Sequence, residues 1–306
     1  MATITFHCRV ITPMFLAGAD GRTPELRAPS IKGAMRFWWR ACNGHLVAQT
    51  TENTWDYSKL KALEGEIFGN TEKKSSFSIQ TRWESRTEGQ LPLPKSGIKI
   101  NVGRFENDIF EYMTYGLWDH KSPSNNRKFV GPGSEFIITL HLHNVNYKKD
   151  ILQSLYCLIQ FGGIGSKARN GFGSFIVAEK DLLNPYAVSP GQFATIEPRD
   201  YSCFSKKSEI HSIKYSKSWM EALASALDTY VSVKNITNIG DKNFIAAHDP
   251  KRLNLERKPK FCFYKVWENE NNLFESKVIF LPYILPAREP QHLNALNAFI
   301  EETKKN

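Results

Sequence analysis

The chain has 306 residues, and its 40 Lys and Arg against 31 Asp and Glu give a formal net charge of +9 at pH 7. With 41% hydrophobic and 23% charged residues, the composition excludes a disordered chain and predicts a globular protein of one large or two ordinary domains. The excess positive charge favours an acidic partner, most often nucleic acid. The apolar runs are too short to span a membrane and the N-terminus does not read as a signal peptide, so we expect no membrane partner and a cytoplasmic location.

The five cysteines do not form any C-x-x-C pair, and their number is odd. This spacing excludes a disulfide framework and a zinc ribbon as the basis of the fold. Cys8, Cys42 and Cys157 fall in apolar patterns, so we expect buried thiols. We predict that the protein carries neither a metal nor another cofactor.

The first 180 residues follow a recognisable element order. Residues 4–10 alternate apolar and polar side chains, which predicts a half-buried strand. A helix is predicted over 31–42, with Ser30 as its N-cap. We then predict a helix over 55–68, a strand over 77–83, an insertion of short strands and loops over 85–132, a strand over 136–142, a helix from 150 to 161 and a strand over 174–178. Without the inserted segments the order is β-α-β-β-α-β, which is ferredoxin-like.

The remaining residues repeat part of this order after a linker that begins at Asn184-Pro185. We predict a strand over 209–214, a helix over 218–233, a basic loop over 242–260, strands over 261–268 and 277–285, and a helix over 290–303. This order is one strand short of a second unit. The predicted fold class is therefore α+β, with tandem ferredoxin-like domains at 1–180 and 181–306, the second of them degenerate.

The helix predicted over 31–42 has two different faces. At 100° per residue, its apolar face collects Ile31, Ala34, Met35, Trp38, Ala41 and Cys42. The opposite face carries Lys32, Arg36 and Arg40, with Trp39 beside them. Cations repel one another at this spacing, and the helix contains no acid to relieve them. A solvated row of cations is one interpretation; the other is a surface that contacts phosphates and stacks on bases, since an exposed Trp lies next to the row.

A glycine-rich loop over 161–173 reads FGGIGSKARNGFG. Glycines let a backbone adopt positive φ and approach a ligand closely. Exposed backbone N–H groups at Gly163, Gly165 and Gly171 would form a nest for anions, and Lys167 and Arg169 add positive charge. A flexible turn between a helix and a strand is the alternative interpretation. Open sheet faces of ferredoxin-like order receive single-stranded RNA in RNA-recognition domains, which gives a third candidate surface.

Four stretches in order carry a resemblance to a known family: ITPMFLAGAD at 11–20, ELRAPSIKGAMRFWWRA at 25–41, EIFG at 66–69 and the glycine-rich loop. They resemble the RAMP superfamily, and most of all the first RAMP subunit of the Cmr effector complex of type III-B CRISPR systems. The resemblance covers most of residues 4–178. The C-terminal part shows only a positional match.

The resemblance implies a non-catalytic subunit that assembles with other Cmr RAMP subunits along a CRISPR RNA, near the 3′ end of the guide, and helps to capture single-stranded target RNA. In that family the basic helix and the glycine-rich loop contact RNA. By position the residues that carry over are Lys32, Arg36, Arg40, Lys167 and Arg169. The predicted RNA-binding set adds Arg27, Trp39, Gly163, Gly165 and Gly171. The basic segment 249–260 is either an RNA contact or a contact to another subunit.

A metal-independent CRISPR RNA endoribonuclease is the main alternative. Such an enzyme needs a general base near the 2′-OH, for which His7 and His45 are candidates. His141 and His143 share one strand face but lack a third metal ligand at fitting spacing. Asp20 and Glu25 would be needed for a carboxylate-metal nuclease, although acids in such loops are usually turn residues. A nucleotide-sensing module that uses the glycine-rich loop is a further alternative.

Overall fold

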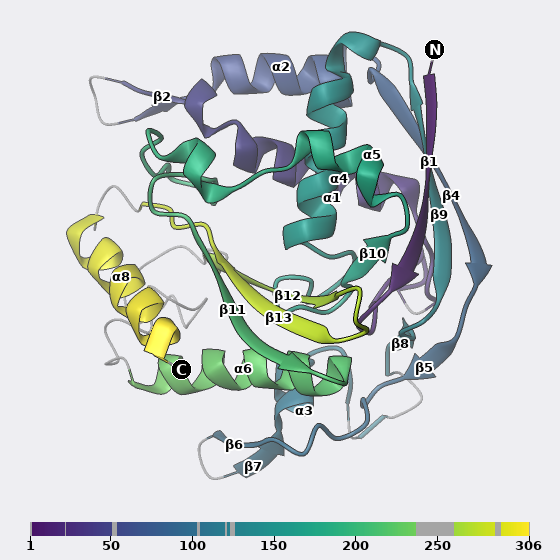
Figure 1. Cartoon of the computed structure of the whole chain (residues 1–306), viewed down its shortest axis with the longest axis vertical. Coiled ribbons are helices and arrows are strands. Elements are labelled where there is room, and N and C mark those ends of the chain that lie inside the picture. The colour runs from purple at the N-terminus through teal and green to yellow at the C-terminus, as the bar shows by residue number, and fades with distance from the viewer. Residues whose placement is uncertain are drawn as a thin grey trace.

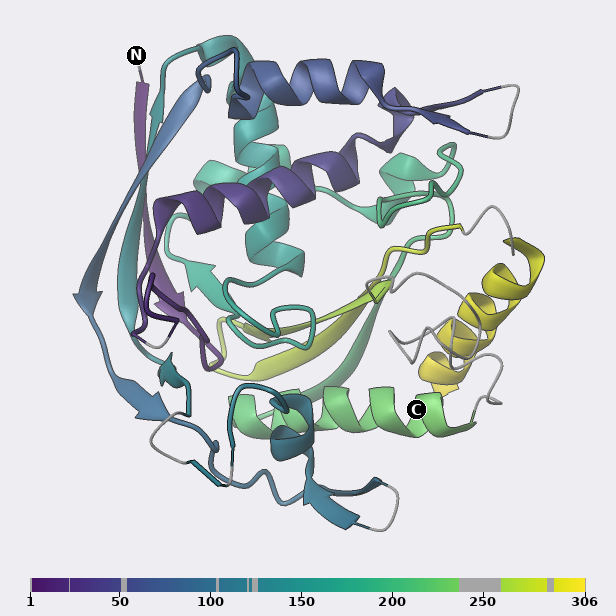
Figure 2. The same ribbon diagram turned by 180° about the vertical axis from the view of Figure 1, so that it is seen from behind.

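The structure is a computed structural model that describes residues 2–21, 23–50, 54–102, 105–119, 121–122, 126–236, 260–284 and 289–305. Apart from Lys260, the basic segment 249–260 lies outside the described residues. Two antiparallel sheets enclose a layer of helices, and further helices cover the far side of the second sheet (Figures 1 and 2). No helix in the described part of the chain is both long and apolar enough to cross a membrane.

The first sheet contains β1 (Ala2–Val10), β4 (Phe77–Ser85), β9 (Glu135–Leu142) and β10 (Phe175–Val177). The strand order is β10-β1-β9-β4, and every neighbouring pair is antiparallel. Since β9 lies between β1 and β4, these two are parallel to each other, which is the split βαβ arrangement. The predicted β-α-β-β-α-β order of the first half is confirmed.

Two helices, α1 (Ala28–Cys42) and α4 (Lys148–Phe161), pack together on one face of this sheet. The helix α1 begins at Ala28 and not after Ser30, because Pro29 fits the first turn of a helix, where its missing N–H costs nothing. The inserted helix α2 spans Ser58–Phe68 and packs on α1. It starts later than predicted, since Trp55–Asp56 form the short strand β3, paired with β2 (Ala48–Gln49).

The segment between β4 and β9 is an irregular lobe, as predicted. Its elements are β5 (Glu88–Gln90), β6 (Lys99–Val102), β7 (Phe105–Asp108), α3 (Ile109–Met113) and β8 (Lys128–Val130). Short 3₁₀ turns lie at Gly44–Leu46, Val145–Tyr147, Asn184–Tyr186 and Pro190–Phe193. Ile109 and Phe110 of the lobe are buried in a core that includes the helix Trp219–Ile236 of the second half, so the lobe connects the two halves.

Apart from a short unpredicted helix at its start, the second half follows the predicted order of elements. They are α5 (Lys180–Leu183), β11 (Glu209–Ser216), α6 (Trp219–Ile236), β12 (Cys262–Glu268), β13 (Phe274–Phe280) and α8 (Glu289–Lys305). The three strands pair antiparallel in the order β11-β13-β12. The strand predicted over 277–285 is displaced, because it begins at Phe274 and ends at Phe280. The boundary at residue 180 and the tandem ferredoxin-like description stay predictions.

The second sheet is buried on both faces. On β12, Phe263 joins the core of α1 and α4, whereas Tyr264 and Val266 join the core of α6 and α8. The period of two along the strand therefore places Lys265 on the α4 side, where it is fully buried. Its Nζ donates to the backbone oxygen of Gly162 at 2.8 Å. No carboxylate in the described part of the chain pairs with it.

Burial of Lys265 predicts a specific pH dependence of stability. Desolvation lowers the pKa of Lys265 from 10.5 to about 7, so the unfolded state binds more protons than the folded state between these values. The contribution of Lys265 to the free energy of unfolding therefore rises with pH in this window, by about 1.4 kcal/mol per pH unit at most. Urea unfolding of the wild type and of Lys265→Met at pH 7 and pH 9 measures it.

We expect the difference in unfolding free energy, wild type minus Lys265→Met, to increase by roughly 2–3 kcal/mol between these pH values. Other titrating groups are common to both proteins and cancel. A difference that stays constant with pH would contradict the assignment.

Candidate nucleic-acid interface

The cationic face of α1 is covered by α2. Glu64, on the buried side of α2, lies between Arg36 and Arg40. Two guanidinium nitrogens of Arg40 donate to this carboxylate: Nη2 to Oε1 at 2.6 Å, and Nε to Oε2. The Nε atom of Arg36 is 3.5 Å from the same carboxylate. The acid that relieves the cation row thus comes from another helix.

Arg36 is also held by the end of α2. Its Nη2 donates to the backbone oxygens of Phe68 at 3.2 Å and Gly69 at 2.9 Å. These are among the last carbonyls of the helix, where the macrodipole is negative. The guanidinium also lies over the Phe68 ring, 5.5 Å from its centre. Arg36 is therefore fixed in position and not a freely moving surface cation.

The prediction that Trp39 is exposed for stacking is wrong. Its side chain is only 1% exposed, its ring packs against Phe68, and its Nε1 donates to Asp150 at 2.9 Å. The reason is that α2 covers the face that an isolated amphipathic helix would leave to solvent. The side chain of Lys32 also packs against the protein, because its Nζ donates to the backbone oxygen of Phe77 at 3.2 Å. Burial, and then the charge of Arg36, lower the pKa of Lys32 to about 8.

The glycines of the loop are mostly required by packing. Gly163 and Gly171 are buried, and a Cβ on Gly163 would lie 2.7 Å from the backbone oxygen of Phe172. Gly171 has φ +85°, and its Cβ would lie 2.7 Å from Leu223 of α6. The prediction that these two glycines present an open anion nest is therefore wrong. Gly165 is exposed, with φ +97°.

The loop itself is tied to the second sheet. The backbone N–H of Tyr264 on β12 donates to the oxygen of Arg169 at 3.0 Å, and Asn170 forms a parallel bridge with Tyr264. The guanidinium of Arg169 lies 4.3 Å from the ring centre of Phe263 and 5.2 Å from that of Phe37 on α1. It also donates to the backbone oxygen of Lys260. No carboxylate in the described part of the chain forms an ion pair with Arg169.

Two predicted cations lie elsewhere. Lys167, in a left-handed conformation at φ 62°, donates to the backbone oxygen of Tyr115 at 2.9 Å and so faces the inserted lobe. Arg27 is exposed at the N-cap of α1. Neither residue lines the cavity described next. Of the predicted set, the structure brings together Arg36, Arg40 and Arg169.

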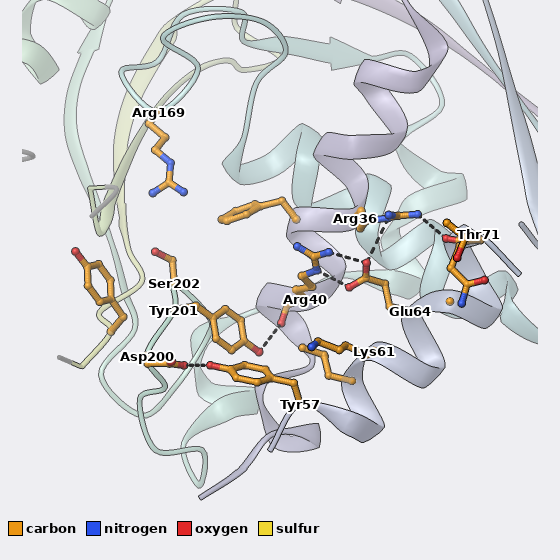
Figure 3. Close-up of a pocket in the computed structure, with 16 residues that line it drawn as sticks. Arg36, Arg40, Tyr57, Lys61, Glu64, Thr71, Arg169, Asp200, Tyr201 and Ser202 are labelled. Carbon is orange, nitrogen blue, oxygen red and sulfur yellow. Dashed lines mark hydrogen bonds and ion pairs between the residues drawn. The ribbon is translucent and has the colours of Figure 1, made fainter. Parts of the chain in front are cut away.

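A cavity of about 950 Å³ lies where these three arginines meet (Figure 3). Arg36 and Arg40 reach it from α1, and Arg169 points into it from the glycine-rich loop. The lining residues are Arg36, Phe37, Arg40, Tyr57, Leu60, Lys61, Glu64, Gly65, Gly69, Asn70, Thr71, Arg169, Asp200, Tyr201, Ser202 and Tyr283. A second hollow of about 370 Å³ shares Phe37 and Arg169 with it and extends along the loop to Ser30. Arg36 and Arg40 of the helix and Arg169 of the loop therefore share one surface, whereas Lys32, Trp39, Arg27 and Lys167 do not line it.

The lining of the larger cavity has a positive balance, with four cations against the carboxylates of Glu64 and Asp200. Hydrogen bonding to Glu64 raises the pKa of Arg40, whereas burial lowers the pKa of Arg169. An arginine stays charged at neutral pH despite such a shift. In the cavity, Arg36 and Arg40 are thus paired with Glu64. Arg169, in contrast, contacts aromatic rings and a carbonyl, and no carboxylate among the described residues pairs with it.

Several lining residues were not predicted from the sequence. Tyr57 donates its hydroxyl to Asp200, and Tyr201 donates its hydroxyl to the backbone oxygen of Arg40 at 3.3 Å. Burial, followed by the bond to Asp200, raises the pKa of Tyr57, and burial raises that of Tyr283 to about 12. All these phenols remain protonated at neutral pH. They add aromatic surface and hydroxyl donors beside the arginines.

The candidate histidines lie outside this cavity. Both oxygens of Glu179 hold His7, through the backbone N–H at 2.8 Å and through Nδ1 at 2.6 Å, and this hydrogen bond raises the pKa of His7. His45 is exposed in a 3₁₀ turn. His141 Nδ1 lies 3.1 Å from the Thr3 hydroxyl, and His143 Nε2 lies 3.2 Å from the Ser78 hydroxyl.

Acidic and metal-ligating residues do not gather into a site. Asp20 accepts two bonds from Thr23, at its backbone N–H (2.9 Å) and its hydroxyl (2.5 Å), as a turn residue does. Glu25 lies beside Gly18 in the same loop. Within the described ranges, no group of three or more His, Cys, Asp or Glu is placed to hold a metal ion.

The sequence of the chain matches a known protein family. The model of the RAMP superfamily matches residues 7–176, more than half of the chain. The CRISPR system Cmr subunit Cmr1-2 of Pyrococcus furiosus is 30% identical over 180 residues, covering 56% of this chain and 93% of that protein.

Solved structures show the same fold. The apo crystal structure of Cmr1 from Pyrococcus furiosus matches with a TM-score of 0.60 at 20% identity, covering 98% of this chain and 96% of that one. A chain of a type III-B Cmr-beta complex bound to cognate target RNA and AMPPnP matches with a TM-score of 0.57 at 14% identity, covering 98% of each chain. The family match, the identity to the Pyrococcus subunit and the shared fold agree, and the chain belongs to the RAMP superfamily.

Proposed function

We propose that this chain is a non-catalytic, RNA-binding subunit of a type III-B CRISPR ribonucleoprotein of the Cmr type. It assembles with other RAMP subunits and binds CRISPR RNA near its 3′ end, target RNA, or both. The similarity to a Cmr subunit and to a chain of a Cmr complex solved with target RNA supports the assembly. The RNA site is the cavity between α1, α2 and the glycine-rich loop.

The observation that carries this proposal is the environment of Arg169. Its guanidinium points into the cavity, is stacked on Phe37 and Phe263, and has no carboxylate partner among the described residues. A partly buried cation without an anion is unfavourable, and a phosphate would supply the missing charge. Arginine suits this role because its planar group bonds phosphate while one face stays on an aromatic ring. The phenol rings nearby suit stacking with bases.

Replacing Arg169 tests the site directly. We expect Arg169→Met to weaken binding of a labelled single-stranded RNA about tenfold, and by a similar factor for different sequences, because the contact is to phosphate. The slope of log affinity against log salt concentration should become shallower by about 0.7, the value for one phosphate contact on a single strand. Fluorescence anisotropy at several salt concentrations measures both quantities.

The matched control is Lys99→Met, which removes the same charge from the inserted lobe, where Lys99 is exposed and paired with Glu106 at 2.7 Å. We expect this variant to bind RNA like the wild type. Equal losses in the two variants would mean that only net charge matters, and the cavity would lose its assignment.

A variant of Trp39 distinguishes a role in packing from a role in RNA contact. Because its indole is buried against α2 and bonded to Asp150, Trp39→Phe should lower the free energy of unfolding by about 1–3 kcal/mol while RNA affinity stays close to the wild-type value. Thermal unfolding and anisotropy on the same preparation measure the two effects. A large loss of affinity with unchanged stability would restore Trp39 to the RNA surface.

The nuclease alternative predicts different chemistry. We expect labelled CRISPR RNA to remain intact when incubated with the pure protein, with or without divalent metal, because neither His7 nor His45, the candidate general bases, lines the cavity. Denaturing gels over a time course provide the measurement. Specific cleavage that disappears in His7→Ala or His45→Ala would overturn the non-catalytic assignment.

A further inference from the structure

We propose that the second half of the chain is the scaffold that positions the glycine-rich loop for RNA, with Lys265 of β12 as the main positioning residue. This inference rests on the proposed function and gives the second half a role in it. It does not require that half to touch RNA.

The first support is that Lys265 connects the two ends of the loop. Its Nζ donates to the backbone oxygen of Gly162, where α4 ends and the loop begins, at 2.8 Å. It also lies 3.4 Å from the oxygen of Phe175, where the loop ends and β10 begins. One buried ammonium group thus fixes the separation of the two loop ends. Gly162 is also the C-cap of α4, so the charge lies at the negative end of that helix.

The second support is that the rest of β12 holds the middle of the loop. Tyr264 bonds the backbone oxygen of Arg169 at 3.0 Å, and the backbone N–H of Val266 reaches the Ser174 hydroxyl at 3.4 Å. Lys260, just before the strand, donates to the Asn170 side chain at 2.8 Å. The loop therefore lies along the edge of β12, bridged to it at Asn170 and Tyr264, and its conformation depends on that edge.

The third support is that the same strand and the residue just before it orient the side chain of Arg169. Phe263 stacks beneath the guanidinium at 4.3 Å, and the backbone oxygen of Lys260 accepts one of its N–H groups. On β12 the side chains of Phe263 and Lys265 are two residues apart and point to the same face of the sheet. The strand that supports Arg169 also closes the loop on which Arg169 lies.

The burial of Lys265 indicates a specific role. It is fully buried without a carboxylate partner among the described residues, and desolvation of a charge is unfavourable. A methionine of similar length would fill the same space without that cost, so stability alone does not account for a lysine here. The lysine differs from methionine in its N–H donors, and both carbonyls that receive them belong to the ends of the loop.

A double-mutant cycle tests the inference. The proteins are the wild type, Lys265→Met, Arg169→Met and the double variant, and anisotropy gives the affinity of each for the same labelled single-stranded RNA. If Lys265 acts through Arg169, Lys265→Met weakens binding about tenfold in the wild-type background and less than about twofold when Arg169 is already replaced. The control Lys277→Met removes an equal charge from β13, where Lys277 pairs with Glu275 at 3.0 Å, and should leave affinity unchanged.

The outcomes separate the inference from the proposed function. If Arg169→Met leaves affinity unchanged, both the RNA site and this inference are overturned. If Arg169→Met weakens binding but Lys265→Met has no effect, or weakens binding equally in both backgrounds, only the inference is overturned. If Lys265→Met does not fold, Trp267→Phe takes its place in the cycle, since Trp267 on the same face of β12 donates to the backbone oxygen of Gln160 at the end of α4 at 3.1 Å.

Discussion

The cavity depends on one arrangement: a backbone loop from the first half lies along the edge of a strand from the second half. The hydrogen bond from Tyr264 to Arg169 and the buried ammonium of Lys265 hold this arrangement. Without it, Arg169 would lie on a mobile surface loop, where a long cation contributes little to a defined site. With it, Arg169 faces the two arginines of α1 across a cavity of fixed shape. The site is therefore a product of both halves, although the family match ends at residue 176.

Glu64 sets the second condition of the site. A row of cations at i, i+4 spacing destabilises a helix unless an anion relieves it. Glu64 supplies that anion to Arg36 and Arg40 and also fixes their geometry through paired hydrogen bonds. Glu64 lies on the buried side of α2 and bonds the two arginines from there. It therefore holds them in place while they still face the cavity. The lining stays net positive, as a site for a sugar-phosphate chain requires.

The sequence was sufficient to predict what depends on periodicity. Strand alternation predicted the two sheets, and the helical spacing of Ile31, Met35 and Trp38 predicted the buried face of α1. Periodicity along one helix does not reveal what packs on its other face, and for this reason Trp39 was assigned to solvent. The placement of Glu64 beside Leu60 and Ile67 on the apolar side of α2 was the available signal, since a buried acid requires a cation. The contributions of Asp200, Tyr201 and Tyr283 could not be predicted, because these residues reach the cavity from irregular segments.

The glycines show how one composition supports two physical interpretations. The composition predicts an open nest of N–H groups at Gly163, Gly165 and Gly171, whereas Gly163, Gly171 and Gly173 are buried against carbonyls and side chains that leave no room for a Cβ. Gly163 and Gly173 let the two ends of the loop approach each other closely, and Gly171 lets the loop pack against α6 and β12. The loop is consequently held in place by packing and does not form an open anion-binding nest. In the proposed function the affinity then comes from side-chain guanidinium groups and aromatic rings. Such groups bind phosphates and the faces of all bases alike, and this favours RNA recognition that is largely independent of sequence.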